Sequence, residues 1–531
     1  MKSFHSYGPV NSKYHFCVDR EEIVTKCINQ LIGIFDESGY YFTIWAPRQT
    51  GKTWLLRQCV KKIKNTYGDQ FIIGDLSMQS FTLTNKDDPD DIFFKSWQDA
   101  IYGEFNIDIG QLNSWDNWLK LFKKNSGLFE KPLILLIDEF DKLPGDIIDK
   151  VVSMFRHIYL KDKEYMLHGL ALVGVRAVLG VNSTKGSPFN IQRSLHIPNL
   201  TFDETIEMFN QYQEESGQEI ESQVIKKLYE TTNGQPGLIG WFGELLTEKY
   251  NFDSNKKIDM DLWSNVYARS SNVEHNNTVQ NIIAKARNEY KPYVFKLFKN
   301  SDIPFSFDTE WCNYMYMHGL ITYAEIHEKN EILHTCRFSS SFIQSRLYKA
   351  FIEEVSETQD EHVLALEPLD LLEDVFEGSS LNLPPLLQRY KAFLERLKNR
   401  GVNPWRNQPR RKTDLHLTEA VGHFHLYYWL QMALSGRCSI IPEFPTGNGK
   451  VDLHLICDDD KKGLIEVKSF VNAYKIKDAV DQAAKYAAKT DYKEVTIAMF
   501  APFTDENVLK QISVQEFIYG VTVNVVAIGQ G

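Results

Sequence analysis

Two groups of residues have the types and spacing for chemistry, and the first lies near the N-terminus. Residues 46–53 read Ala-Pro-Arg-Gln-Thr-Gly-Lys-Thr and stand between an apolar run and an amphipathic stretch, Trp54–Tyr67. A loop between a buried strand and a helix points backbone N–H groups at a phosphate, and Gly51 allows close approach. Lys52 adds positive charge, and the Thr53 hydroxyl can ligate Mg²⁺. The pattern predicts a phosphate-binding loop (P-loop) that binds nucleotide through Arg48, Gln49, Thr50, Gly51, Lys52 and Thr53, although Ala46 replaces the usual first glycine.

A pair of carboxylates completes this first group. The apolar run Leu133–Ile137 ends in Asp138 and Glu139. Carboxylates at the end of a buried strand are costly unless they have a role. We expect Asp138 to hold Mg²⁺ through water and Glu139 to orient or deprotonate the attacking water. The two motifs together predict a site for ATP and Mg²⁺ that hydrolyses ATP.

The second group lies near the C-terminus, on an expected hairpin of strands 450–455 and 464–468. Alternate residues of a strand share a face, so Glu466 and Lys468 should point the same way while Ile465 and Val467 face the core. Asp452, on the partner strand, can reach the same patch. Two carboxylates and a lysine suit metal-assisted phosphodiester hydrolysis. An exposed strand with alternating charges would give the same pattern.

This hairpin resembles the PD-(D/E)XK nuclease superfamily, with Asp452 and Glu466-Val467-Lys468 as the signature and Val451 in place of the proline. Gln482-Ala483-Ala484-Lys485-Tyr486 is similar to the QxxxY element of one branch, and Glu419 begins the preceding helix. The resemblance implies catalytic roles for Asp452, Glu466, Lys468, Gln482 and Glu419. It implies Mg²⁺, with Mn²⁺ as an alternative, on Asp452, Glu466 and Glu419. His423 could reach this site, but an interior histidine is the favoured interpretation.

Residues 8–350 resemble a second family, the AAA-like ATPases near the signal-transducing (STAND-type) and archaeal-type P-loop ATPases. The resemblance is carried by residues 16–21, 174–176, 187–191 and 234–238. It implies that Arg20 lies against the adenine and that Pro236 lies in a lid turn facing the nucleotide. Arg176 would occupy a sensor position near the γ-phosphate, although a surface arginine is an equal alternative.

The pattern of apolar runs predicts an α/β protein. We expect a P-loop NTPase core with parallel strands at 40–45, 71–76, 133–137 and 170–174, a helical lid and a winged helix, followed by a restriction-endonuclease-like α/β domain. The winged helix would carry a hairpin of strands 321–326 and 332–338. The expected boundaries are 1–200 for the core, 201–272 for the lid, 273–352 for the winged helix, 353–412 for a charged linker and 413–531 for the nuclease domain.

The charge of the expected linker changes from negative to positive along its length. Residues 351–388 hold ten acidic side chains and no Lys or Arg, whereas residues 395–412 hold seven basic side chains and one acid. The basic run could bind backbone phosphates, although a solvated linker is nearly as good an interpretation. The acidic stretch could cover the basic run in a resting state.

Composition limits the function classes. A net charge of −11 argues against a protein that coats nucleic acid non-specifically, and no apolar run approaches the roughly 20 residues that span a bilayer. The seven cysteines have no CxxC pair, which favours free thiols in a reducing cytoplasm over disulfides or a zinc site.

We therefore expect a cytoplasmic, ATP-regulated, Mg²⁺-dependent nuclease that acts on nucleic acid, with DNA favoured, and that has no membrane contact. A role in prokaryotic defence against phage or plasmids fits by analogy, and a homo-oligomer, a protein partner or a phage-derived trigger are open. The alternatives are a nucleotide-dependent sensor or loader that binds nucleic acid without cutting it, and a scaffold that uses ATP to set its shape.

Overall fold

The chain forms two compact units in the computed structural model. The first contains residues 1–266 and 307–319, and the second contains residues 267–306 and 320–531. The structure describes residues 2–33, 38–81, 88–174, 193–299, 303–328, 331–355, 364–367, 370–377, 380–405, 408, 419–434, 437–443, 452–457, 461–489 and 492–530.

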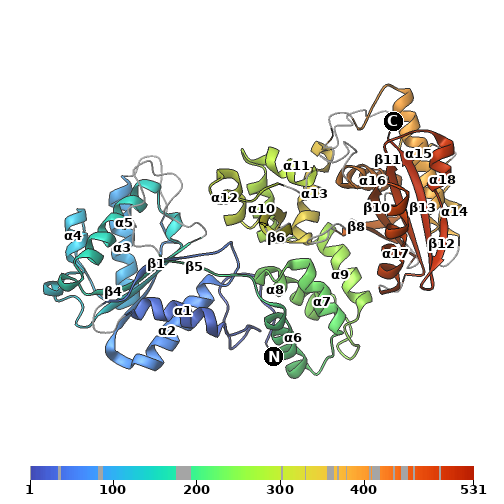
Figure 1. Cartoon of the computed structure of the whole chain (residues 1–531). Coiled ribbons are helices and arrows are strands. Elements are labelled where there is room, and N and C mark those ends of the chain that lie inside the picture. The colour runs from blue at the N-terminus through green and yellow to red at the C-terminus, as the bar shows by residue number, and fades with distance from the viewer. Residues whose placement is uncertain are drawn as a thin grey trace. The chain divides into compact units, whose positions relative to one another are not determined.

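A five-stranded parallel sheet forms the centre of the first unit (Figure 1). Its order is β2-β3-β4-β1-β5, and all four pairs of neighbouring strands are parallel over the described residues. The strands are β1 (Tyr41–Trp45), β2 (Ile72–Ser77), β3 (Leu133–Asp138), β4 (Leu167–Gly174) and β5 (Arg193–His196). β1, β3 and β4 are almost wholly buried, as expected for apolar runs covered on both faces. The predicted α/β class and its four core strands are confirmed.

Helices cover both faces of this sheet. Consecutive residues of β3 point to opposite faces, and each set is buried against a different group of helices. Leu133, Leu135 and Ile137 pack in one core cluster with α3 (Pro89–Phe105), α4 (Trp115–Lys120) and α5 (Gly145–Leu160). Ile134 and Leu136 pack in another with α1 (Glu21–Ile32) and α2 (Lys52–Tyr67). The P-loop therefore joins β1, which lies between β4 and the edge strand β5, to a helix that is packed along its length.

Four helices follow the sheet, where the sequence predicts a lid. They are α6 (Phe202–Ser216), α7 (Ser222–Thr232), α8 (Pro236–Glu244) and α9 (Met260–Asn272). A capping box begins α6: the Thr201 hydroxyl accepts from the Glu204 N–H, and the Glu204 carboxylate accepts from the Thr201 N–H. Asn233 and Gly234 both have positive φ and form the turn before α8.

The segment predicted as a winged helix is divided between the units. The second unit holds α10 (Asn277–Ala286), α11 (Lys291–Lys299), α13 (Ser341–Val355) and the hairpin of β6 (Ile321–Glu328) and β7 (Glu331–Phe338). The first unit holds α12 (Glu310–Met317). The predicted strands are present, and the winged helix itself stays a prediction.

A six-stranded mixed sheet forms the C-terminal part of the second unit, in the order β12-β13-β11-β10-β9-β8 (Figure 1). The antiparallel strands β8 (Cys438–Glu443), β9 (Asp452–Cys457) and β10 (Lys462–Ser469) are followed by β11 (Glu494–Ala501), parallel to β10, and by β12 (Gln515–Ile518) and β13 (Val521–Gly529). The helices are α14 (Glu373–Phe376), α15 (Leu383–Asn399), α16 (Glu419–Ala433), α17 (Ala473–Lys489) and α18 (Glu506–Ile512).

Part of the expected charged linker packs on this sheet. α15 contacts β11 and β13, and its Tyr390 ring lies 6.3 Å from that of Phe500. Trp405 is buried and its ring lies 5.0 Å from that of His425. Residues that the charge pattern assigned to a connector therefore cover one face of the C-terminal sheet.

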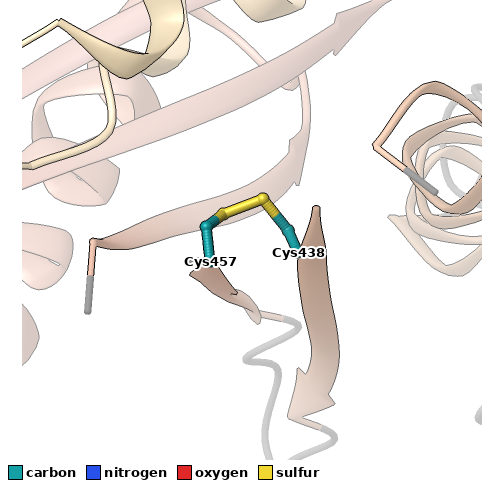
Figure 2. The surroundings of a disulfide bond; sticks show 2 residues. All are labelled: Cys438 and Cys457. Atoms are coloured by element: carbon teal, nitrogen blue, oxygen red, sulfur yellow. A yellow bond between two sulfur atoms is a disulfide. The ribbon is translucent and has the colours of Figure 1, made fainter. Parts of the chain in front are cut away.

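One cysteine pair corrects the expectation of free thiols. Cys438 and Cys457 form a disulfide, while the other five cysteines are free (Figure 2). The two residues face each other across the β8–β9 ladder, with their Cα atoms 3.9 Å apart. The sequence separation of 19 carries no local motif, so only the strand register could reveal the pair.

This disulfide should stabilise the second unit, because closing a loop of this length removes about 3 kcal/mol of unfolded-state entropy. We expect a Cys438→Ser/Cys457→Ser double variant to lose about that much stability in urea unfolding. Reductant should destabilise the wild type and leave the double variant unchanged, and a Cys17→Ser variant should behave like the wild type. Equal stabilities in oxidised and reduced wild type would contradict this.

Within the part of the chain that the structure describes, no helix is both long and apolar enough to cross a membrane.

Candidate nucleotide and metal sites

The P-loop adopts a conformation that its sequence explains. Gln49 and Gly51 have positive φ values of 57° and 88°, and Gly51 caps the N-terminus of α2. A side chain would be strained at Gly51 for this reason, even though space is open around it. The Thr50 hydroxyl donates to the carbonyl of Pro47 at 2.8 Å, which closes the loop on itself.

The Lys52 ammonium lies inside this loop. It donates to the carbonyl oxygens of Ala46 at 3.0 Å and Pro47 at 2.8 Å. Burial lowers the pKa of Lys52, and the carboxylates of Asp138, Asp141 and Glu139 oppose that effect. A buried ammonium facing nearby carboxylates suits a role as a phosphate-binding charge.

The carboxylate pair stands beside the first turn of α2. The Thr53 hydroxyl donates to Asp138 Oδ2 at 2.9 Å, and the Glu139 N–H donates to Asp138 Oδ1 at 2.8 Å. Glu139 has a φ of 54°, so the chain turns sharply after β3. Thr53 and Asp138, the residues predicted to hold Mg²⁺, are therefore in direct contact, and their oxygen atoms fit a hard cation.

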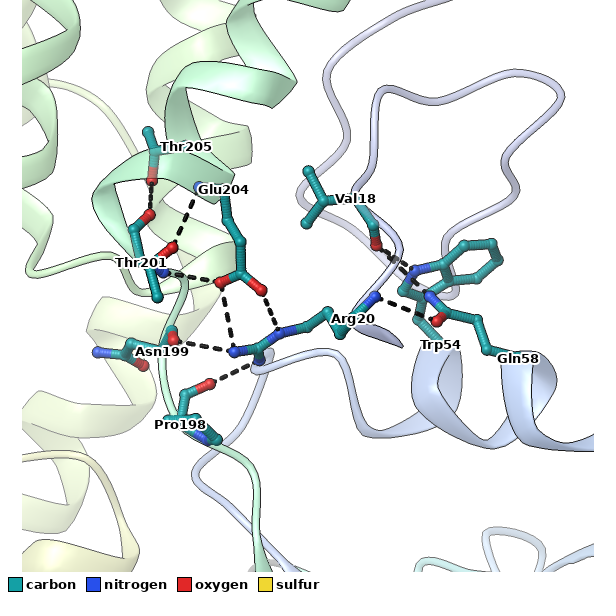
Figure 3. Close-up of polar contacts among 9 residues, drawn as sticks. All are labelled: Val18, Arg20, Trp54, Gln58, Pro198, Asn199, Thr201, Glu204 and Thr205. Carbon is teal, nitrogen blue, oxygen red and sulfur yellow. Dashed lines mark hydrogen bonds and ion pairs between the residues drawn. The ribbon is translucent and has the colours of Figure 1, made fainter. Parts of the chain in front are cut away.

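Arg20 contacts the segment 198–201 that joins the sheet to the lid, called the hinge below (Figure 3). Its guanidinium pairs with Glu204 (Nε to Oε1, 3.1 Å) and donates to the carbonyls of Pro198 at 2.7 Å and Asn199 at 3.1 Å. Its backbone N–H donates to Gln58 of α2 at 3.3 Å. Arg20 thus links α2, the hinge and the capping box of α6, and its contact with adenine stays a prediction. Arg176 lies outside the described residues.

Asp75 of β2 is an acid near this site that the sequence analysis missed. Its pKa is raised to about 6, first by burial and then by the carboxylates of Glu104 and Asp138. The Asp75 N–H donates to Glu104 Oε1 at 3.1 Å. An isolated acidic residue within an otherwise apolar strand was the sequence signal that could have predicted Asp75 as part of this site.

The C-terminal site contains a buried ion pair. Glu466 Oε1 lies 3.0 Å from Lys468 Nζ, and the side chains are 1% and 11% exposed. Both Glu466 oxygens are buried, and neither has a hydrogen-bond partner with good geometry among the residues that the structure describes, so the ammonium is close but poorly aligned. The predicted shared face is confirmed, and the alternative of an exposed charged strand is excluded by burial.

The strand register adds Asp452 to this pair. Asp452 stands directly opposite Glu466 in the β9–β10 ladder, although its side chain lies outside the described residues. Among the side chains that are described, no group of three or more His, Cys, Asp and Glu could hold a metal ion. The metal site predicted from Asp452, Glu466 and Glu419 therefore stays a prediction.

α17 covers the face on which Glu466 lies. Leu464, two residues before Glu466, packs with Val480 and Ala483 of this helix. Gln482 of α17 is exposed, and the Tyr486 hydroxyl lies 3.5 Å from Nε2 of His454. Tyr492 approaches the other ring nitrogen of His454 at 3.1 Å. His454 was not predicted, and its position two residues after Asp452 was the signal for it.

α16 packs on the opposite face of the sheet. A Cβ atom at Gly422 of α16 would lie 2.6 Å from the Phe500 ring, so α16 packs against the face on which Phe500 lies. Phe500 pairs with Ser469 in the parallel ladder, so the two side chains share that face. Lys468, the residue before Ser469, points to the other face. Glu419 begins this helix, and its part in the metal site stays a prediction. His423 is 1% exposed, which agrees with the interior interpretation.

The buried histidines of α16 should make the second unit sensitive to acid. Burial lowers the pKa of His423 to about 3 and that of His425 to about 4, from 6.5. Between these values and 6.5 the unfolded chain binds more protons, so stability should fall by about 2 kcal/mol per histidine between pH 7 and pH 5. His425→Gln should remove about half of that loss in urea unfolding, while an unchanged pH slope would refute the assignment.

The acidic stretch contacts a basic helix. Arg396 of α15 lies 3.5 Å from Glu367 and 3.8 Å from Asp370, and Arg389 lies 2.8 Å from Asp374. Arg396 also donates to the Ala365 carbonyl at 3.0 Å. These contacts join one member of the basic run to the acidic stretch. The basic residues at 406 and 410–412 lie outside the described residues.

Comparisons with known proteins agree with the first site. Residues 5–254 match the family model described as an AAA-like domain, and residues 410–504 match a domain of unknown function (DUF8371). No curated protein matches the chain. The first match covers less than half of the chain and supports the predicted AAA-like P-loop domain over residues 5–254, together with the P-loop and the parallel sheet. The second match names no activity, so the nuclease assignment stays a prediction.

Several solved structures are similar to the chain at low identity. A Walker-type ATPase of Pyrococcus abyssi is 16% identical with a TM-score of 0.42, over 65% of this chain and 99% of that one. The ORC1 protein of Aeropyrum pernix, solved with DNA, is 12% identical with a TM-score of 0.31, over 66% and 96%. The RuvB Holliday junction branch migration motor of Thermotoga maritima is 14% identical with a TM-score of 0.33, over 60% and 92%.

Proposed function

We propose that the chain is an ATP-regulated, metal-dependent nuclease. The observation that carries the proposal is the Glu466 carboxylate, which is 1% exposed and whose oxygens have no aligned hydrogen-bond partner among the described side chains. A buried charge usually neutralises or finds a partner, and leaving its oxygens unsatisfied is costly. A divalent cation bound between Glu466 and the facing position of Asp452 would satisfy these oxygens.

The residues around Glu466 suit phosphodiester hydrolysis. Mg²⁺ or Mn²⁺ held there would polarise the phosphate and acidify a water. Lys468, 3.0 Å from Glu466, can stabilise negative charge that develops on phosphorus or position the water. The exposed Gln482 of α17 is available to a substrate.

The AAA-like domain would regulate this activity. A nucleotide and Mg²⁺ bound by Lys52, Thr53 and Asp138 would change the contacts between the sheet and the lid. We take DNA as the favoured substrate and the cytoplasm as the location, a compartment in which a disulfide such as Cys438–Cys457 is rare. A role in prokaryotic defence rests on analogy.

The direct test is cleavage of plasmid DNA, single-stranded DNA and RNA by the purified full chain. Each substrate is assayed with Mg²⁺, Mn²⁺ or EDTA, and with ATP, ADP or no nucleotide. We expect metal-dependent cutting that EDTA abolishes and that responds to nucleotide. Tight binding of nucleic acid with no cutting under any of these conditions would favour the sensor or loader instead.

A further inference from the structure

A glutamine at the start of the lid helix α8 contacts the outer side of the P-loop. Gln235 precedes α8, and its Nε2 donates to the carbonyl oxygens of Arg48 at 3.1 Å and Gln49 at 3.4 Å. Its Oε1 accepts from the Leu238 N–H and thereby caps the helix. One side chain thus serves as helix cap and P-loop contact at once.

The backbone around Gln235 is arranged for the same contact. The Gly237 N–H donates to the Gln49 carbonyl at 3.1 Å. A Cβ atom at Gly237 would lie 2.7 Å from Gln49 Cβ, so only glycine allows this approach. The N-terminus of α8, with its partial positive charge, therefore faces the P-loop carbonyls.

The N-terminal segment holds the other side of the contact. Gln49 Nε2 donates to the Ser6 carbonyl at 3.0 Å, and the Ser6 hydroxyl donates to Glu244 of α8 at 3.2 Å. Ser6 is buried. The P-loop, the segment around Ser6 and α8 form a closed set of hydrogen bonds.

We propose that Gln235 is a positioning residue that couples the conformation of the P-loop to the lid helix α8. A P-loop presents its N–H groups to the phosphates on one side, so its carbonyls are free to bind on the other. Gln235 fixes two of those carbonyls and thereby holds the phosphate-binding side in shape. Nucleotide bound there is released when the lid helix and the loop separate.

This inference rests on nucleotide binding by the AAA-like domain and is independent of nuclease activity. Two variants separate the two roles of Gln235. Gln235→Ser keeps a hydroxyl that can cap the helix but is too short to reach Arg48. Gln235→Lys keeps a long donor for the carbonyls but cannot accept from the Leu238 N–H.

The test is stopped-flow dissociation of a fluorescent ATP analogue from the full chain with Mg²⁺. We expect Gln235→Ser to speed dissociation about tenfold, the value of roughly two neutral hydrogen bonds, and Gln235→Lys to stay near the wild type. Ser114→Ala, which removes the N-cap of α4 and touches no P-loop residue, should lower the melting temperature and leave dissociation unchanged.

Wild-type dissociation from Gln235→Ser would overturn the proposal. Equal acceleration by the serine and lysine variants would also overturn it, because the helix cap would then be the cause. If the serine variant does not fold, Gln235→Glu takes its place, because it can accept from the Leu238 N–H but cannot donate to the carbonyls of Arg48 and Gln49. Wild-type dissociation from Gln235→Glu would then overturn the proposal. A wild type that binds no nucleotide would instead refute ATP binding by the domain.

Discussion

Replacing Glu466 with glutamine should reduce metal-dependent cleavage about a thousandfold and leave ATP hydrolysis unchanged. Glutamine keeps the shape of the side chain and removes the charge that would bind a cation, whose contribution to such reactions is several kcal/mol. The ATPase site belongs to the first unit and shares no residue with β10. The measurement is initial cleavage rate against Mg²⁺ concentration, with ATP turnover on the same preparation.

A purely structural ion pair between Glu466 and Lys468 would give another result. Loss of the Glu466 charge would remove this ion pair from the buried Lys468 ammonium, which destabilises the fold. Mg²⁺ would then not raise the melting temperature of the wild type, whereas a metal ligand predicts that Mg²⁺ stabilises the wild type and not Glu466→Gln.

A second glutamate of the same sheet supplies the control. Glu494 of β11 is partly buried and accepts from Asn524 at 2.7 Å. Glu494→Gln should leave the cleavage rate unchanged. If Glu494→Gln and Glu466→Gln lowered the rate equally, general damage to the sheet would explain both, and the nuclease assignment would lose its support.

The strands of the first sheet were predictable because burial on both faces leaves a strong signal. Continuous apolar runs give β1, β3 and β4 within a few residues, and the P-loop and Asp138–Glu139 lie at the ends of two of them. β5 was missed because Arg193–His196 is short and polar. The residues of the predicted nucleotide site could therefore be located from local sequence alone.

What the sequence could not give were contacts between distant segments. The Cys438–Cys457 disulfide depends on the β8–β9 register, and the Arg20–Glu204 pair joins residues 184 positions apart. Glu466 is buried because α17 covers its face of the sheet. The alternation of side chains along β10 predicts which residues share that face but not whether a helix covers it. α15 was assigned to a linker by its charges, although its apolar stripe, including Leu386, Tyr390 and Phe393, packs on the sheet.

Lys52→Ala should abolish nucleotide binding, with ATP affinity reduced at least about a hundredfold and turnover at background. The Lys52 ammonium supplies the positive charge inside the P-loop, and no other described lysine or arginine side chain donates to the loop carbonyls of Ala46 and Pro47. Calorimetric titration with a non-hydrolysable ATP analogue measures the loss. Lys61→Ala, an exposed lysine on the same helix, should bind like the wild type.

The fold should survive this substitution. Removing Lys52 frees two carbonyl oxygens at the edge of the loop and also removes a buried charge whose pKa is already lowered by burial. We therefore expect the nucleotide-free melting temperature to change little, so that lost binding reports the missing charge. Cleavage by Lys52→Ala then gives the sign of regulation: faster cutting means that ATP restrains the nuclease, and lost cutting means that ATP licenses it. Wild-type ATP affinity in this variant would show that the P-loop does not bind the nucleotide as proposed.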